Sequence, residues 1–134
     1  MKKLLVFLVF CLMNLVSFSA MKDGIYYVEK EYDNEWTSFV KITVKNDKII
    51  GAQYDRKNSE GVLLSFDQKE NDKSKSKYGF TFRDMSFSLT RSLVSNQKIE
   101  GNDVKDPKVI EEFKKMTDYL IEKANNGQDG VYKL

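Results

Sequence analysis

Apolar and polar side chains alternate with a period of two along residues 36–45, which is typical of a strand with one buried face. Residues 25–32, rich in Tyr and Val, and residues 49–55 predict two further strands. One side of the central stretch carries Ser38, Val40, Ile42 and Val44, and the other carries Thr37, Lys41, Thr43 and Lys45. The order of these stretches predicts an antiparallel meander of three strands.

Two short polar segments, 33–35 and 46–48, separate the predicted strands. Asn46 and Asp47 tolerate the positive φ that a tight hairpin turn requires. Because a small isolated sheet is only marginally stable in water, we expect helices to cover one of its faces.

Residues 107–125 predict such a covering helix, since their apolar positions recur at helical spacing and the opposite side is charged. The apolar positions are Val109, Phe113, Met116, Leu120 and Ala124, and the charged ones are Glu111, Lys115, Asp118 and Glu122. Asp106 is suited to the N-cap, Pro107 to the first helical position and Gly127 to the end.

The middle of the chain gives a less regular pattern. The apolar residues of 80–95 fit both a helix and a strand, and the length of the segment favours a helix. The helical set is Phe82, Met85, Leu89 and Leu93, and the strand set is Met85, Phe87 and Leu89. Residues 69–77 read KENDKSKSK and predict a solvated loop.

A short motif links the two ends of the domain. Asp-Gly-Ile-Tyr at 23–26 returns as Asp-Gly-Val-Tyr at 129–132, and each reads as a turn followed by a strand. We therefore expect both ends in one sheet. The predicted fold class is α+β: a small antiparallel β-meander covered by one or two helices, with a short C-terminal strand, in a single domain over 20–134.

Residues 1–19 have the three parts of a signal peptide. Lys2 and Lys3 give a basic start, residues 4–13 are apolar, and small residues follow. The apolar run is shorter than the about 20 residues of a membrane-spanning helix. We expect cleavage before Ala20 or directly after it, and an extracytoplasmic protein of the periplasm, cell envelope or medium. An uncleaved anchor is the alternative, and only then would the protein be associated with the membrane.

The composition of the remaining domain excludes several chemistries. Cys11, the only cysteine, lies in the apolar run, and the chain has no His, so residues 20–134 lack thiolate and imidazole nucleophiles and ligands. No calcium-loop spacing is present, and we predict no metal site. Removing Lys2 and Lys3 from the 22 basic residues leaves 20, against 20 acidic ones. A neutral domain is not expected to bind nucleic acid.

Three short stretches of the sequence resemble a known family. Asp-Gly-Ile-Tyr at 23–26, the alternating strand at 36–45 and Asn-Asp-Lys-Ile-Ile-Gly-Ala at 46–52 resemble the opening of small exported bacterial FMN-binding domains. Among these are membrane-anchored immunogen lipoproteins and electron-transfer lipoproteins. The resemblance covers most of 20–134 and implies a middle helix, a closing helix and a last strand.

The same resemblance implies where a flavin would be attached. In flavin-carrying members, the FMN phosphate is esterified to a Thr or Ser in a motif just before the closing helix. The matching stretch here, 99–108, contains neither residue type. We therefore expect no covalent flavin, and non-covalent FMN remains open.

Lys105, Lys108 and Trp36 are the candidate cofactor-binding residues. The two lysines flank a predicted helix start, whose free backbone N–H groups suit a phosphate. The alternative is that Asp106 caps those groups and the lysines are merely exposed. Trp36 has a ring that could stack on a flavin, and its alternative role is core packing.

The sequence predicts an exported cell-envelope protein with a degenerate FMN-binding-like domain, used as a non-catalytic module that binds a small ligand or another envelope protein. The alternative is a non-covalent flavin-binding accessory protein in extracytoplasmic electron transfer. No catalytic residue is assigned, because no pattern places paired carboxylates in a cleft, whether Glu29 with Glu31 or Glu111 with Glu112.

Overall fold

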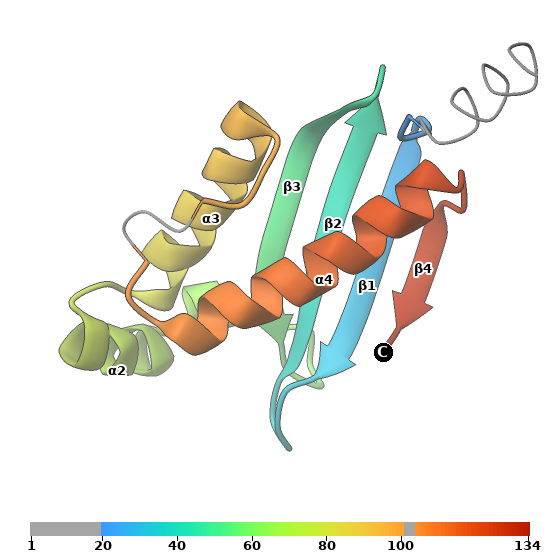
Figure 1. Ribbon diagram of the computed structural model, residues 1–134. Coiled ribbons are helices and arrows are strands. Elements are labelled where there is room, and N and C mark those ends of the chain that lie inside the picture. Colours follow the sequence, from blue (N-terminus) through green and yellow to red (C-terminus); the bar gives the residue numbers. More distant parts are fainter. Residues whose placement is uncertain (1–19, 101–103) are drawn as a thin grey trace, which may run out of the picture.

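A computed structural model describes residues 20–100 and 104–134. Its elements are β1 (Gly24–Glu31), β2 (Thr37–Lys45), β3 (Lys48–Lys57), the short 3-10 helix η1 (Leu64–Phe66), α2 (Gln68–Tyr78), α3 (Phe82–Asn96), α4 (Pro107–Asn125) and β4 (Gly130–Lys133). The strands form one mixed sheet in the order β3-β2-β1-β4 (Figure 1). The predicted α+β class is confirmed.

The predicted meander is confirmed as β1, β2 and β3, each antiparallel to the next. Asn46 and Asp47 adopt φ values of 51° and 60°, so both sit in the left-handed region that a two-residue hairpin turn requires. The Asn46 amide also donates to Asp23 Oδ1 at 2.9 Å, which ties the hairpin tip to the start of β1.

The last strand, β4, lies parallel to β1, with Tyr26 opposite Gly130 and Val28 opposite Tyr132. The expectation that the two ends share one sheet is therefore confirmed. Because parallel neighbours need a long crossover, this pairing depends on α4, which runs diagonally over β1 and β2 and returns the chain to the β1 edge (Figure 1).

Helix α4 has the predicted bounds and the predicted cap. The Asp106 carboxylate accepts hydrogen bonds from the backbone amides of Lys108, at 3.0 Å, and Val109, at 3.4 Å, and Pro107 occupies the first turn. The predicted apolar side of the helix is the buried one, formed by Val109, Phe113, Met116, Leu120 and Ala124. These side chains cover the central strands of the sheet.

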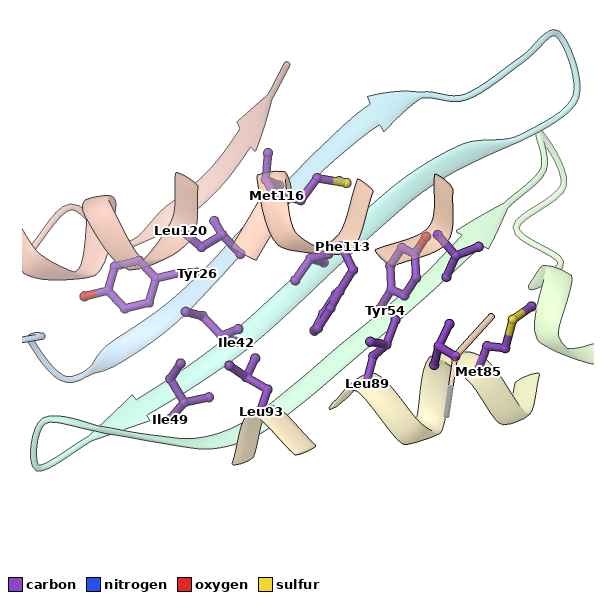
Figure 2. Close-up of a cluster of buried hydrophobic side chains, with 14 of the residues drawn as sticks. Tyr26, Ile42, Ile49, Tyr54, Met85, Leu89, Leu93, Phe113, Met116 and Leu120 are labelled. Carbon is purple, nitrogen blue, oxygen red and sulfur yellow. The ribbon is translucent and has the colours of Figure 1, made fainter. Parts of the chain in front are cut away.

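Helix α3 settles the ambiguous middle segment as helical. Thr81 caps it by accepting a hydrogen bond from the Asp84 amide at 3.0 Å. The helix packs beside β3, and the Ser86 hydroxyl donates to the Tyr54 carbonyl of that strand. It therefore shields the outer edge of the sheet. Figure 2 shows the resulting core, in which α3 supplies Met85, Leu89 and Leu93, α4 supplies Phe113, Met116 and Leu120, and the sheet supplies Tyr26, Ile42, Ile49 and Tyr54.

The prediction of a solvated loop at 69–77 is wrong, because this segment lies within α2. The Asp67 carboxylate accepts from the Glu70 amide at 3.0 Å, and Gly79, at φ 82°, ends the helix in the left-handed conformation. No residue of α2 is buried. The segment is solvated as expected, and capping at both ends makes it helical.

Residues 1–19, which carry the predicted signal peptide, lie outside the described part of the chain. Within 20–100 and 104–134, no helix is both long and apolar enough to cross a membrane.

Candidate functional site

A buried ion pair joins the end of the sheet to α4. Arg56 is the second-last residue of β3, and Glu112 lies in the second turn of α4. Strand alternation places Arg56 on the same face as Tyr54, directly under the helix. The Arg56 Nη2 atom is 3.0 Å from Glu112 Oε1, and the two side chains are 8% and 17% exposed.

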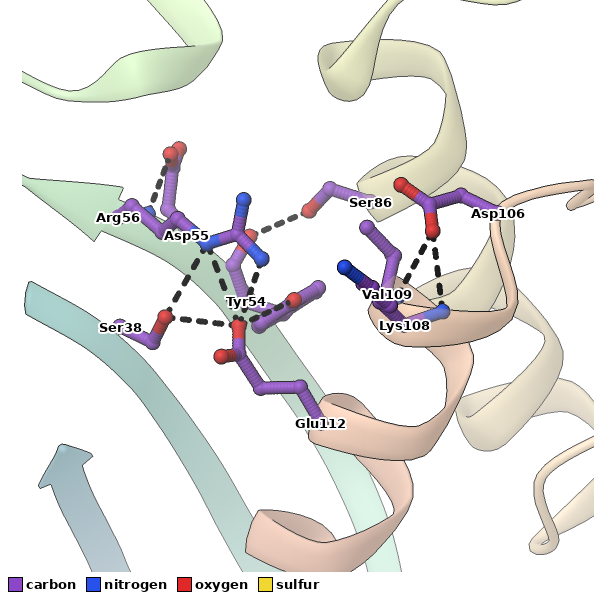
Figure 3. Close-up of polar contacts among 9 residues, drawn as sticks. All are labelled: Ser38, Tyr54, Asp55, Arg56, Ser86, Asp106, Lys108, Val109 and Glu112. Carbon is purple, nitrogen blue, oxygen red and sulfur yellow. Dashed lines mark hydrogen bonds and ion pairs between the residues drawn. The ribbon is translucent and has the colours of Figure 1, made fainter. Parts of the chain in front are cut away.

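One carboxylate oxygen collects all the donors of this centre. Glu112 Oε1 accepts from the hydroxyls of Ser38 and Tyr54, each at 2.7 Å, and from Arg56 Nη2 and Nε at 3.0 and 3.3 Å. The Arg56 Nε also lies 3.1 Å from Ser38 Oγ (Figure 3). Residues of β2, β3 and α4 therefore meet on a single acceptor.

Two aromatic rings enclose the Arg56 guanidinium. Its central carbon is 3.7 Å from the ring centroid of Tyr32 and 5.0 Å from that of Phe82. Phe82 is buried, whereas Tyr32 is exposed. A cation over the face of an aromatic ring is stabilised by the quadrupole of the ring. Tyr32 therefore acts as the outer cover of the ion pair.

The charge states of this centre follow from burial and from the neighbouring groups. Burial raises the pKa of Tyr54 well above its usual value, and the Glu112 carboxylate adds to the rise. Burial by itself lowers the pKa of Arg56, but its interactions with the neighbouring Tyr54 side chain and with the Glu112 carboxylate outweigh that effect, and the pKa is raised. Tyr54 thus stays a neutral donor and Arg56 stays a cation.

A hollow of about 220 Å³ opens beside this centre. It lies between the first half of α4 and the adjoining ends of β1 and β4, and its lining is Lys30, Tyr32, Lys108, Glu111, Glu112, Lys115, Met116 and Leu134. Arg56 already balances Glu112, so three lysines face Glu111 alone. The lining of the hollow carries more positive than negative charge even when a C-terminal carboxylate at Leu134 is included.

The three residues predicted for the cofactor are not gathered at this hollow. Lys108 lies in its wall, whereas Lys105 and Trp36 do not line it. Lys105 is exposed before α4. Trp36 is 6% exposed and belongs to the core, where its indole Nε1 has no hydrogen-bond partner among the described residues. Of the three residues predicted for the cofactor, only Lys108 lines the hollow.

The start of α4 does not fit the phosphate of FMN. The Asp106 carboxylate already accepts from the amides of Lys108 and Val109, as Figure 3 shows. A phosphate there would have to displace this carboxylate, and its charge would be repelled by it. The hollow is also smaller than the about 300 to 1,000 Å³ of pockets for drug-sized ligands.

Sequence reasoning missed Arg56 and Tyr32, and it considered Glu112 only as one of a pair of carboxylates, with Glu111, that no pattern placed in a cleft; both line the hollow. One signal for Glu112 was available, because it lies three residues after Val109 and next to Phe113 on the apolar side of the helix. A carboxylate at such a position needs a buried partner. Arg56 is two residues beyond Tyr54 on the same face of β3, and it meets that requirement. No pattern in the sequence indicates the role of Tyr32.

Within residues 20–100 and 104–134, no group of three or more acidic, His or Cys side chains is placed to hold a metal ion. The site is thus a positively charged hollow beside a pair of ionised residues that neutralise each other. Its elements are those of a small α+β domain in which two helices cover one face of a mixed sheet.

No family model matches this chain, and a search of curated proteins gives no significant match. Among solved structures, a crystal structure of a protein from Clostridium perfringens has a TM-score of 0.77 at 23% identity, covering 85% of this chain and 97% of the other. A solution NMR structure of a protein from Clostridium thermocellum gives a TM-score of 0.47 at 21% identity, with coverages of 83% and 95%. The first likeness shows a shared fold and extends no further.

Proposed function

We propose that this chain is an exported cell-envelope protein that binds small anionic ligands without transforming them. The observation that carries the proposal is the hollow at α4, where Lys30, Lys108 and Lys115 surround an opening next to Tyr32. Met116 and Leu134 give it apolar surface as well. A ligand with one negative group and a small apolar body matches such a lining.

A binding role rather than catalysis is supported by the arrangement of Glu112. Its Oε1 atom is engaged by four donor contacts, one each from Ser38 and Tyr54 and two from Arg56. A general base must be available to accept a proton from the substrate. Together with the lack of His and Cys in residues 20–134, this favours a fixed scaffold for contacts.

The test uses benzoate, which combines a carboxylate with a small apolar ring, and inorganic phosphate as a purely polar probe. We expect benzoate to raise the melting temperature of the full chain at constant ionic strength, because a ligand that binds only the folded state stabilises it. Lys30→Ala and Lys108→Ala should each reduce this rise. Lys114→Ala removes an exposed lysine of α4 outside the hollow and serves as the matched control. An unchanged melting temperature with both probes would count against the proposal.

The second candidate is the flavin-binding accessory role that the family resemblance implies. Lys108, predicted to contact the phosphate, does line the hollow next to the Tyr32 ring, and this favours retaining it. The Asp106 cap and the size of the hollow weigh against it. Titration of the purified chain with FMN distinguishes the two candidate functions. Saturable FMN binding that Lys108→Ala weakens would favour the flavin-binding role over the first proposal.

Covalent attachment is tested separately by mass spectrometry of the chain made together with an active flavin transferase. We expect the unmodified mass, because residues 99–108 offer no hydroxyl side chain. An added mass equal to that of FMN would refute the expectation.

A further inference from the structure

We propose that the outer face of α3 is a docking surface for an acidic segment of another protein that inserts one apolar side chain. The surface, here called the arginine–phenylalanine face, consists of Phe66, Arg83, Phe87 and Arg91. It lies outside the lining of the hollow at α4 and does not depend on the ligand proposed for that hollow.

Two phenylalanine rings on this face are exposed beside one arginine. Phe66 is 68% and Phe87 is 49% exposed. The central guanidinium carbon of Arg83 lies 5.3 Å from the Phe66 ring centroid and 5.4 Å from that of Phe87. The three side chains therefore form one continuous apolar and cationic patch. Large aromatic side chains left in water at neighbouring positions mark an interaction site.

A hollow of about 200 Å³ lies behind the two rings. Its remaining walls come from the β3 segment Ala52–Asp55, from Leu63 and Ser65 near η1, and from Ser86 and Thr90 of α3. The Asp55 carboxylate in this wall accepts hydrogen bonds from the Ser65 hydroxyl and amide and from the Arg56 amide, so its oxygens have partners within the protein. An apolar side chain is of the right size to enter between Phe66 and Phe87.

A second hollow continues the face along α3. Phe87 and Arg91 both line it, together with Asp84, Ser88, Ser92, Ser95 and Asn96. Residues 83, 87 and 91 are four apart, so their side chains follow one side of the helix. Among the described residues, neither Arg83 nor Arg91 takes part in an ion pair. Arg83 and Arg91 thus lie on opposite sides of Phe87 along the helix.

The charge of the surrounding helices points to an acidic partner. Over α2 and α3 the chain carries six basic residues, Lys69, Lys73, Lys75, Lys77, Arg83 and Arg91, against three acidic ones, Glu70, Asp72 and Asp84. Residues 20–134 as a whole are balanced, so positive charge is concentrated here. Complementary charge steers a partner to a surface and fixes its orientation.

The concave shape favours a protein segment over a membrane. A bilayer surface attracts basic and aromatic residues that project outward, whereas here the rings border a hollow of about 200 Å³ that has room for an inserted side chain. Arginine and aromatic residues are enriched at the energetically important positions of protein interfaces. The partner we infer carries an aromatic or aliphatic anchor between carboxylates.

The probe is a blocked pentapeptide with a central tryptophan between two glutamates on each side, titrated into the full chain by calorimetry at low salt. We expect saturable binding that is at least tenfold weaker when the tryptophan is replaced by alanine or the glutamates by lysines. Phe87→Ala and Arg91→Glu should each weaken the binding at least tenfold. Both side chains are exposed, so the melting temperature of each variant should stay close to that of the parent.

Ile25→Ala is the matched control, since Ile25 is 53% exposed and lies on the sheet, away from α3. It should leave peptide binding unchanged. Equal binding of the lysine peptide, no binding of the glutamate peptide, or unaltered binding by Phe87→Ala would each overturn the proposal. A membrane role would also overturn the proposal. It would be indicated if the chain co-sedimented with phosphatidylglycerol vesicles, if Phe87→Ala abolished this co-sedimentation, and if the peptide did not bind. Lys30→Ala should not alter peptide binding, which separates this result from the fate of the small-ligand proposal.

Discussion

Glu112 holds α4 to the sheet through contacts that no other residue of the helix makes. Its single oxygen joins Ser38, Tyr54 and Arg56, and these come from two different strands. A buried ion pair adds little stability over a well-packed apolar pair, but removing one partner leaves the other charge without compensation. Loss of one partner is therefore expected to cost more stability than the intact pair adds.

Glu112→Ala should lower the free energy of unfolding by about 3 to 5 kcal/mol, because Arg56 and Tyr54 would lose their common acceptor inside the protein. Glu112→Gln retains an acceptor oxygen and should cost less. Urea unfolding of both variants, with Glu111→Ala as an exposed neighbour, measures this. Similar losses for Glu112→Ala and Glu111→Ala would show that the ion pair has no such role.

A second charge cluster lies on the face of the sheet opposite the helices. Glu29 Oε2 is 2.9 Å from Lys57 Nζ and accepts from the Tyr27 hydroxyl at 2.8 Å. The hydrogen bond from Lys57 is the main cause of the lowered pKa of Glu29, and Tyr27 contributes as well. The Tyr27 ring stacks on Phe39 at 5.6 Å, so the cluster also covers an aromatic side chain.

This lowered pKa gives a pH dependence of known sign. An unfolded glutamate has a pKa of about 4.3. Folded Glu29 binds its proton less readily, so its ionised form stabilises the protein above that pH. The contribution is lost as the pH falls through the lowered folded pKa. Urea unfolding from pH 7 to pH 3 should show the stability gap between the parent and Glu29→Gln shrinking toward low pH. A gap that is constant with pH, or the same behaviour in Glu31→Gln, would contradict this assignment.

At the scale of elements, α4 is the helix that the sequence specifies most completely. An N-cap, a proline in the first turn and an apolar side with helical spacing all indicate the same bounds. Helix α2 shows the opposite case. It has no apolar side to reveal it, and its helical state depends on Asp67 at one end and Gly79 at the other. A periodicity argument cannot detect such a helix, because no face of it is buried.

Phe113→Ala should destabilise the domain by about 3 to 5 kcal/mol, since Phe113 is fully buried and a cavity would remain. Its ring lies 5.2 Å from that of Tyr54, so part of the loss would come from this aromatic contact. Lys114→Ala, one position further along the same helix, is exposed and should change stability by less than about 0.5 kcal/mol. Both variants are measured by urea unfolding. An equally small loss in the free energy of unfolding for both would refute the assigned core face.

At the scale of the whole molecule, the two ends of the domain are neighbours. Tyr26 pairs with Gly130 in the sheet, and the Lys22 amide donates to the Ala124 carbonyl at 2.9 Å. The residues that directly follow the predicted cleavage point are therefore tied to the end of α4. A mature chain that begins at Ala20 or Met21 would retain these contacts.

Export is tested by N-terminal sequencing of the protein recovered from its host envelope. We expect the sequence to begin at Ala20 or Met21, because Ser17 and Ser19 provide the small side chains that precede a cleavage site. Ser17 and Ser19 replaced together by bulky residues should leave the longer chain uncleaved. Recovery of the parent protein with Met1 still present would identify residues 1–19 as an anchor.

Local patterns in the sequence determined the three-strand meander, the hairpin turn at Asn46 and Asp47, the closing helix with its buried side, and the presence of both ends in one sheet. Each depends on neighbours in the chain or on a repeated motif, and burial of one face produces a regular spacing that can be read directly. Only the tertiary structure decided the ion pair of Arg56 with Glu112, the hollow at α4 and the arginine–phenylalanine face. Arg56 and Glu112 are 56 residues apart, and a contact at that separation leaves no spacing in a single sequence. It arises because α4 crosses β2 next to β3, and packing of the whole core sets that crossing.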